Sequence, residues 1–181
     1  MKTWITSDNH FYHNNIITYC DRPFNNVNEM NEIMIKNWNN VVGEEDIVYH
    51  LGDFALTGIE KAKEICEMLN GYKILVKGNH DASKSKMLRM GFDEFHTGYL
   101  EYYDNILVHN LHNLPDDIDI VNCLGVSVDL WQYSPIPLPI IKDVILFGHT
   151  HELYLIRNRK TTKTEKTDEG FLESVRNEEE W

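Results

Sequence analysis

Five short apolar runs of this chain end in side chains that can bind metal ions. The runs, with the residues that follow them, are TWITSDNH (3–10), EDIVYHLGD (45–53), KILVKGNHD (73–81), NILVH (105–109) and DVILFGHTH (143–151). Apolar runs this short, bounded by turn residues, are typical of buried strands. Ligand sites in open α/β sheets gather at the carboxyl ends of the strands. We therefore expect the five runs to be strands whose ends lie together at one rim of the fold.

The stretches around these runs predict the rest of the architecture. Helical spacing of apolar residues predicts helices over 27–42 and 59–69, and a short helix closed by Gly91 is expected over 83–90. The predicted strands are 3–7, 47–51, 74–76, 99–103, 106–108, 121–131 and 144–147. The prolines of SPIPLP (134–139) favour an extended loop or a sheet edge. Strands that alternate with helices and then follow one another are typical of a layered α/β domain.

Length and composition limit the kind of protein this can be. We expect a single domain over residues 1–156, with a charged tail or extra strands of the same domain over 157–181. The net charge of -12 counts against electrostatic binding to DNA or to an anionic membrane. No apolar run reaches the roughly 18 to 20 residues of a membrane helix. The three cysteines show no paired spacing, which favours a reducing, cytoplasmic setting.

The metal-capable side chains form a set of oxygen and nitrogen ligands without a thiolate. The set comprises Asp8, His10, Asp53, Asn79, His109, His149 and His151. Carboxylates, imidazoles and an amide suit catalytic manganese, iron, zinc, nickel or cobalt better than structural zinc. Two carboxylates and three or four imidazoles exceed the needs of one ion with an open position. They match two divalent ions that share a bridging carboxylate, so the sequence predicts a dinuclear metal site.

The order of these motifs resembles that of the calcineurin-like metallophosphoesterase superfamily. The superfamily motifs D-x-H, G-D, G-N-H-[DE], H and G-H-x-H correspond here to DNH, GD, GNHD, the first histidine of LVHN and GHTH. SDNHFYHNNII, CDRPF, EMNEIMIKNW and DIVYHLGDFAL are also similar to a bacterial and phage branch of small phosphoesterases. The resemblance implies a central β-sandwich flanked by helices, with the metal site at the carboxyl ends of the strands.

The resemblance also implies a role for each residue of the motifs. Asp8, His10 and His151 would bind the first metal, Asp53 would bridge, and Asn79, His109 and His149 would bind the second metal. Asn79 would also contact the phosphate. His80 would be the general acid that protonates the leaving oxygen, and Asp81 would orient its ring.

Three points stay open at the level of the sequence. His112 could replace His109 as a ligand, although His109 directly follows the apolar run. His13 and Arg22 could reach a substrate phosphate by charge-assisted hydrogen bonds, or they could serve as a packing imidazole and a surface ion pair. In the related branch a segment like GVSVDLWQYSP follows the G-H-x-H motif, whereas here residues 125–135 precede it. Either the C-terminal strands are rewired or this likeness is accidental.

Together these features predict a dinuclear metal-dependent phosphoesterase. A metal-bridging hydroxide would attack a phosphomonoester or phosphodiester, with His80 as the general acid. We expect a small or nucleotide-like substrate, because the net charge of -12 disfavours long nucleic acids. The alternatives are a nuclease or polynucleotide phosphatase, and a catalytically silent metal-binding scaffold for a protein partner. The resemblance implies the cytoplasm of a bacterium or of a phage-infected host.

Overall fold

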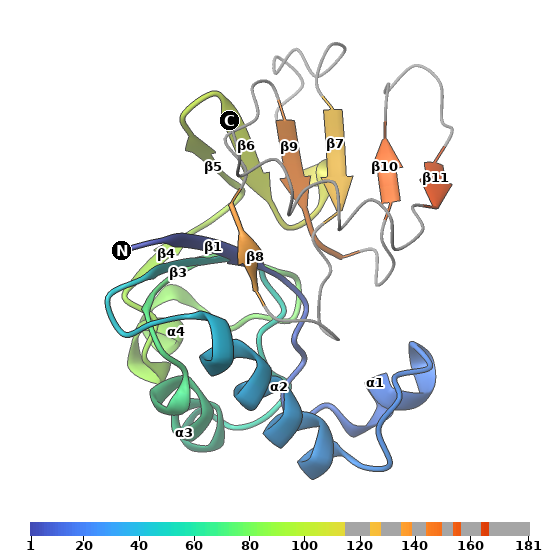
Figure 1. Cartoon of the computed structure of the whole chain (residues 1–181), viewed down its shortest axis with the longest axis vertical. Helices are drawn as coiled ribbons and strands as arrows, with labels where there is room; N and C mark the ends of the chain where they lie inside the picture. The colour runs from blue at the N-terminus through green and yellow to red at the C-terminus, as the bar shows by residue number, and fades with distance from the viewer. Residues whose placement is uncertain (115–123, 128–134, 139–143, 150–153, 157–163, 167–181) are drawn as a thin grey trace.

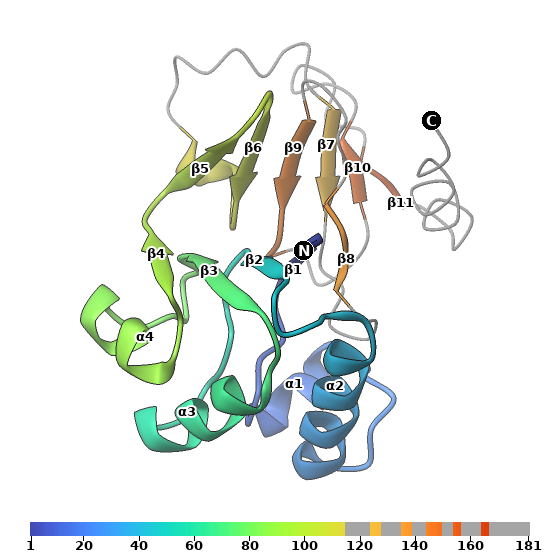
Figure 2. The same ribbon diagram turned by 60° about the vertical axis from the view of Figure 1, so that its left-hand side comes forward.

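The chain folds into two β-sheets with helices packed against one of them. The computed structural model describes residues 1–114, 124–127, 135–138, 144–149, 154–156 and 164–166. The first sheet lies between the helices and the second sheet in Figure 1, and Figure 2 shows the same layers from another side. The predicted architecture, a layered α/β fold with a β-sandwich flanked by helices, is confirmed.

The first sheet has the strand order β4-β3-β2-β1-β8. Its strands are β1 (Thr3–Thr6), β2 (Ile47–His50), β3 (Tyr72–Val76), β4 (Glu94–His96) and β8 (Ile136–Pro137). Strands β1 to β4 are parallel, so the loops that follow them leave from the same edge of the sheet. Strand β8 pairs antiparallel with β1 and ends the strand order, so Ile136–Pro137 within SPIPLP lie at a sheet edge, one of the two expected positions.

The second sheet has the order β11-β10-β7-β9-β6-β5. Its strands are β5 (Tyr99–Tyr102), β6 (Asn105–Val108), β7 (Leu124–Ser127), β9 (Val144–Phe147), β10 (Tyr154–Ile156) and β11 (Thr164–Lys166). Strands β6 and β7 both run parallel to β9, so the carboxyl ends of β6 and β9 reach the same edge. Strand β7 places residues 125–127, the start of the GVSVDLWQYSP segment, in this sheet ahead of β9 in the chain, and residues 128–134 lie outside the described residues.

The described residues contain four α-helices. They are α1 (Asn14–Tyr19), α2 (Val27–Val41), α3 (Ile59–Met68) and α4 (Lys84–Met90). The three predicted helices are confirmed to within one residue at each end. Asn26 caps the start of α2, because its side chain accepts the N–H groups of Asn28 and Glu29. The sequence pattern missed α1 and β4 because neither is long enough to show a period. Within this part of the chain, no helix combines the length and apolar character needed to cross a membrane.

The strands of the first sheet are covered on both faces, which explains their continuous apolar runs. Toward the helices, Trp4, Val48 and Leu75 belong to one core cluster with Met30 and Trp38. Toward the second sheet, a separate cluster contains Ile5, Leu51, Val76, Leu107, Ile136, Leu138 and Leu146. Two packed layers therefore hold the strand ends on a rigid base, from which the loops can project functional side chains.

Candidate metal centre

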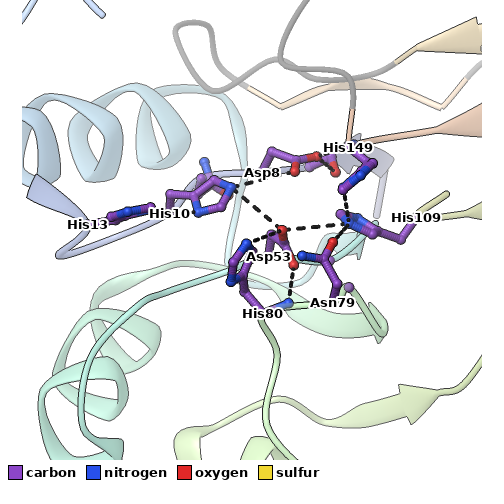
Figure 3. Close-up of polar contacts among 12 residues, drawn as sticks. Asp8, His10, His13, Asp53, Asn79, His80, His109 and His149 are labelled. Carbon is purple, nitrogen blue, oxygen red and sulfur yellow. Dashed lines mark hydrogen bonds and ion pairs between the residues drawn. The ribbon is translucent and has the colours of Figure 1, made fainter. Parts of the chain in front are cut away.

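Side chains from five loops meet where the ends of β1, β2 and β3 face the ends of β6 and β9. Figure 3 labels Asp8, His10, His13, Asp53, Asn79, His80, His109 and His149 in this region. Four of these, Asp8, His10, Asp53 and His109, are fully buried, whereas Asn79, His80 and His149 are exposed. The strand ends thus meet at one rim, where the buried carboxylates and imidazoles form the inner part of the site. The exposed residues mark its open side, which faces solvent.

Two glycines let these loops pack against one another. Gly52 has φ 93° and leads directly into Asp53. A Cβ atom on Gly52 would lie 2.8 Å from His109 Nδ1, and a Cβ atom on Gly78 would collide with the side chain of Asp53. Position 52 therefore requires glycine for its positive φ and for the close approach, and position 78 requires it for the close approach alone.

Four residues of the site have a left-handed backbone, which is uncommon for residues that carry a Cβ atom. The φ angle is 55° at Asp8, 52° at His10, 57° at Asp53 and 68° at His149. Such conformations cost of order 1–3 kcal/mol each and persist only where the surrounding structure holds them. Their concentration here is typical of a functional site, since strain of this kind gathers where side chains must point in a set direction.

Asp8, His10 and Asp53 form the first of two clusters that could hold a metal ion. His10 Nε2 lies 3.7 Å from Asp8 Oδ1 and 3.7 Å from Asp53 Oδ2. Within the described part of the chain, both carboxylate oxygens are buried without a hydrogen-bond partner, which is costly unless a cation compensates them. Two ligands about 2.1 Å from one ion lie roughly 3 to 4 Å apart, so these atoms have the spacing of ligands to a common cation.

Asp53, His109 and His149 form the second cluster. The Nδ1–H of His109 donates to the carbonyl oxygen of Leu51 at 2.7 Å, so the Nε2 of the neutral ring carries a lone pair and no proton. That nitrogen lies 2.9 Å from Asn79 Oδ1, 3.2 Å from His149 Nδ1 and 3.6 Å from Asp53 Oδ2. A histidine that donates one N–H to a backbone carbonyl and presents the other nitrogen has the arrangement of a metal ligand.

The electrostatics of Asp8 and His149 favour the forms that bind metals. Burial raises the pKa of Asp8, but its contacts with His10, His109, Ser7 and the N–H of His149 outweigh burial and bring the pKa to about 2. The His149 N–H donates to Asp8 Oδ2 at 2.9 Å, which leaves Oδ1 for another partner. Burial lowers the pKa of His149 and favours the neutral imidazole. Metals bind ionised carboxylates and neutral imidazoles.

Asp53 belongs to both clusters, and its Oδ2 atom lies at their junction. The Nε2 atoms of His10 and His109 lie 3.7 and 3.6 Å from this oxygen, beyond hydrogen-bond distance. An oxygen and nitrogen set without thiolates suits divalent cations of the manganese to zinc series. The residues present therefore fit divalent metal ions, with Asp53 as the connection between the two clusters.

His80 lies beside the clusters on the open side. Its side chain is 45% exposed, and its Nε2 atom lies 3.9 Å from Asp53 Oδ2. Its backbone N–H donates to Asp53 Oδ1 at 2.8 Å, and its ring meets the His10 ring edge-on with centroids 5.6 Å apart. The backbone of His80 is thus fixed to the metal-capable cluster while the imidazole can reach both a bound molecule and solvent.

Asp81 holds the backbone around Asp53, and its predicted alignment of the His80 ring stays a prediction. Its carboxylate accepts the N–H of Asp53 at 2.9 Å, of Phe54 at 3.0 Å and of Gly78 at 2.8 Å. Burial raises the pKa of Asp81, opposed by these three hydrogen bonds. The turns after β2 and β3 leave these backbone N–H groups in a buried region, and Asp81 satisfies them. Asp81 therefore positions Asp53.

Arg22 is buried beneath the first loop, and its contact with a substrate phosphate stays a prediction. Its Nη1 and Nη2 atoms donate to the carbonyl oxygens of Asn9 and Asp8, both at 2.8 Å. The planar guanidinium thereby supports the backbone that carries Asp8. His13 lies on the open side, with its Nδ1 atom 3.2 Å from His10 Nδ1, and its contact with a substrate stays a prediction.

His50 and Ser7 hold the loops of the site in place by buried hydrogen bonds. The Nδ1 of His50 accepts the N–H of Gly52 at 3.1 Å, so its Nε2–H donates to Asn9 Oδ1 at 2.7 Å. Burial lowers the pKa of His50 to about 3, which keeps the ring neutral and confirms a structural role beside the site. The Ser7 hydroxyl contacts Asp8 Oδ2 and lies 3.0 Å from the carbonyl oxygen of Leu51. Sequence reasoning missed Ser7 and Asn9, whose only signal is their place next to the DNH motif and within it.

Of the two histidines in LVHNLHN, His109 is the one that reaches the clusters. Strand β6 ends at Val108, so His109 stands at the strand end and points into the site. His112 is exposed in the 3-10 turn η1 (Leu111–Asn113). His151 lies outside the described residues, and its place among the ligands of the first metal stays a prediction.

The fold and this site define a class of protein: two facing sheets whose strand ends present aspartates and histidines in a metal-capable arrangement. The chain belongs to the calcineurin-like phosphoesterase superfamily, whose domain model matches residues 1–165.

Two relatives extend this assignment without giving an activity. The uncharacterised protein MJ1445 of Methanocaldococcus jannaschii is 39% identical over 163 residues, which cover 81% of this chain and 93% of the relative. A crystal structure of AQ665, a protein of unknown function from Aquifex aeolicus, is similar with a TM-score of 0.52 and 35% identity. That match covers 65% of this chain and 63% of the Aquifex chain, slightly less than two thirds of its length.

Proposed function

We propose that the protein is a metal-dependent phosphoester hydrolase that works with two divalent ions. The observation that carries this proposal is the position of Asp53 Oδ2 between His10 Nε2 at 3.7 Å and His109 Nε2 at 3.6 Å. The first ion would be held by Asp8, His10, His151 and Asp53, and the second by Asp53, Asn79, His109 and His149. Manganese, iron, zinc, nickel and cobalt all accept this ligand set.

The residues around the clusters would bind and orient the substrate. When bound, divalent ions hold the phosphoryl group and generate a nucleophile from water at neutral pH. The Asn79 Oδ1 atom faces His109 Nε2 at 2.9 Å, which leaves its NH₂ group to donate to a phosphoryl oxygen. His13, on the open side next to His10, can donate to a second oxygen of the same group.

His80 would supply the proton that the leaving oxygen needs. Its exposed ring lies beside Asp53 and the His10 ring, so the same imidazole can face a bound phosphoester and collect a proton from solvent. General acid catalysis of this kind contributes about 10²- to 10⁴-fold. A small phosphomonoester or phosphodiester, including a nucleotide, fits better than long nucleic acid, because the net charge of -12 repels a polyanion.

Metal loading combined with a substrate screen tests this function. The protein is stripped with EDTA, reloaded with Mn, Ni, Co, Zn or Mg in turn, and assayed against phosphomonoesters, phosphodiesters and pyrophosphates. We expect about two ions per chain by mass spectrometry and turnover that EDTA abolishes. A protein that binds two ions and hydrolyses none of these classes would support the metal-binding scaffold instead. A protein that binds no divalent ion would contradict both.

Arg22→Met is expected to weaken metal binding about 10- to 100-fold, as is usual for residues that support metal ligands. The substitution removes the two donors that hold the carbonyl oxygens of Asp8 and Asn9, so the left-handed turn that aims Asp8 can relax. Competition with a fluorescent chelator measures the affinity, and Arg89→Met on the exposed face of α4 is the control. Unchanged affinity in folded Arg22→Met would contradict this positioning role.

A further inference from the structure

A cavity of about 370 Å³ opens beside the second metal-capable cluster. Two residues of the site, Asn79 and His109, form one side of it. The cavity extends from them to Lys77, Gly98, Asn110 and Asn113. Its volume lies at the lower end of the range of small-molecule sites. A molecule whose phosphate sits at the clusters can therefore extend into this space.

The lining of the cavity is positive and rich in hydrogen-bond donors. The Lys77 ammonium donates to the carbonyl oxygen of Gly78 at 3.1 Å, which holds the charge near the cavity and leaves further N–H groups for a ligand. The Asn110 Oδ1 atom accepts the N–H of His112 at 3.0 Å, so its NH₂ group is the part left for a ligand. The described lining residues include no carboxylate, although the whole chain has a net charge of -12.

We propose that this cavity binds a second phosphate group of the substrate, one that is not hydrolysed. The inference rests on the proposed function, because it places the reacting phosphate at the two clusters, and it names the substrate class as small molecules with two phosphates at different positions. Lys77 supplies the point charge that phosphate binding uses, and the amides of Asn110 and Asn113 supply neutral donors.

The open wall of the cavity supports an occupant larger than water. A Cβ atom on Gly98 would meet no atom within 4 Å, so the chain leaves space here that a ligand can fill. Asn113 is exposed on η1 and lines the cavity. A sugar carrying the second phosphate would place its ring between the phosphate at the clusters and the phosphate in the cavity.

The test compares adenosine 3′,5′-bisphosphate with adenosine 5′-monophosphate, which lacks the second phosphate. The assay measures kcat/KM for the bisphosphate divided by kcat/KM for the monophosphate, and we expect wild type to favour the bisphosphate. Lys77→Met should lower this ratio about 10-fold or more, the effect of losing one charge-assisted hydrogen bond. Asn113→Asp, a change at an exposed position, should lower it by placing a like charge in the cavity. Lys36→Met, on the exposed face of α2, should leave the ratio unchanged.

A binding measurement separates failure of the cavity from failure of hydrolysis. Both compounds are titrated onto the metal-loaded protein by calorimetry, which requires no turnover. Suppose that wild type hydrolyses neither compound but binds the bisphosphate more tightly, and that Lys77→Met removes that preference. The proposed phosphate site in the cavity is then supported, and the proposed hydrolysis is contradicted. The cavity proposal is overturned if wild type shows no preference for the bisphosphate in either assay. It is also overturned if Lys77→Met and Asn113→Asp both keep that preference. In either case, turnover of the monophosphate would leave the proposed function intact.

Discussion

Asp53→Asn is expected to remove metal from both clusters at once and to lower phosphoester turnover about 10³-fold or more. A carboxylate shared by two ions cannot be replaced by a neutral amide without loss of charge at both, and the ions supply several kcal/mol of transition-state stabilisation. The position of Asp53 Oδ2 between His10 and His109 makes this substitution more severe than loss of either histidine. Metal content per chain by mass spectrometry and kcat at saturating substrate measure the effect.

The same substitution should not destabilise the metal-free protein. Asp53 Oδ2 is buried without a hydrogen-bond partner among the described residues, and removing an uncompensated buried charge relieves its desolvation cost. The amide oxygen of asparagine can still accept the N–H of His80, as Asp53 Oδ1 does at 2.8 Å. Thermal unfolding in EDTA is therefore expected to give a midpoint at or above that of wild type. Added Mn²⁺ should raise the midpoint of wild type and leave that of Asp53→Asn unchanged.

Asp46→Asn is the matched control, because Asp46 is a buried aspartate outside both clusters. It accepts the N–H of Lys2 at 2.6 Å, of Gly43 at 3.0 Å and the indole N–H of Trp4 at 2.9 Å. Its replacement is expected to lower the unfolding midpoint while the metal content stays at the wild-type value. Two ions per chain in Asp53→Asn would contradict the bridging role.

The sequence pattern was sufficient to find the residues of the clusters because these residues follow the ends of strands, and the apolar runs show where the strands end. An apolar run predicts a strand, its last residue marks the rim, and the next polar side chain is at the site. This reasoning separates His109 from His112, since β6 ends at Val108 and three more residues carry the chain into the exposed η1 turn. The same logic locates Asp53 and Asn79, each directly after a glycine that stands two residues beyond the last residue of its strand.

The roles of Asp81 and Arg22 could not be predicted in the same way. Both residues satisfy backbone groups of other loops: Asp81 accepts N–H groups after β2, and Arg22 donates to carbonyl groups after β1. Which backbone groups lack partners depends on the three-dimensional course of the turns, including the left-handed conformations at Asp8 and Asp53. A pattern of residue types along one chain contains no information about those partners.

His80→Gln is expected to lower kcat about 10²- to 10⁴-fold for alkyl phosphoesters while the protein keeps its metal. The residue lies outside both metal-capable clusters, and the backbone N–H that it donates to Asp53 is retained by any side chain. The loss should be much smaller for para-nitrophenyl esters, because para-nitrophenolate departs without protonation. Turnover of the two esters at equal metal content measures the difference, which a merely structural role would not produce.

The control for His80 is His96→Gln on β4, a histidine whose Nε2 lies 3.3 Å from Glu94 Oε2 and which contributes to neither cluster. This substitution should change the turnover of neither ester. An equal loss for both esters in His80→Gln would indicate that the imidazole holds the phosphoryl group and donates no proton to the leaving oxygen. Undiminished turnover of the alkyl ester would exclude His80 from the chemistry, and His13, whose ring centroid lies 6.5 Å from that of His80, would be the next side chain to replace.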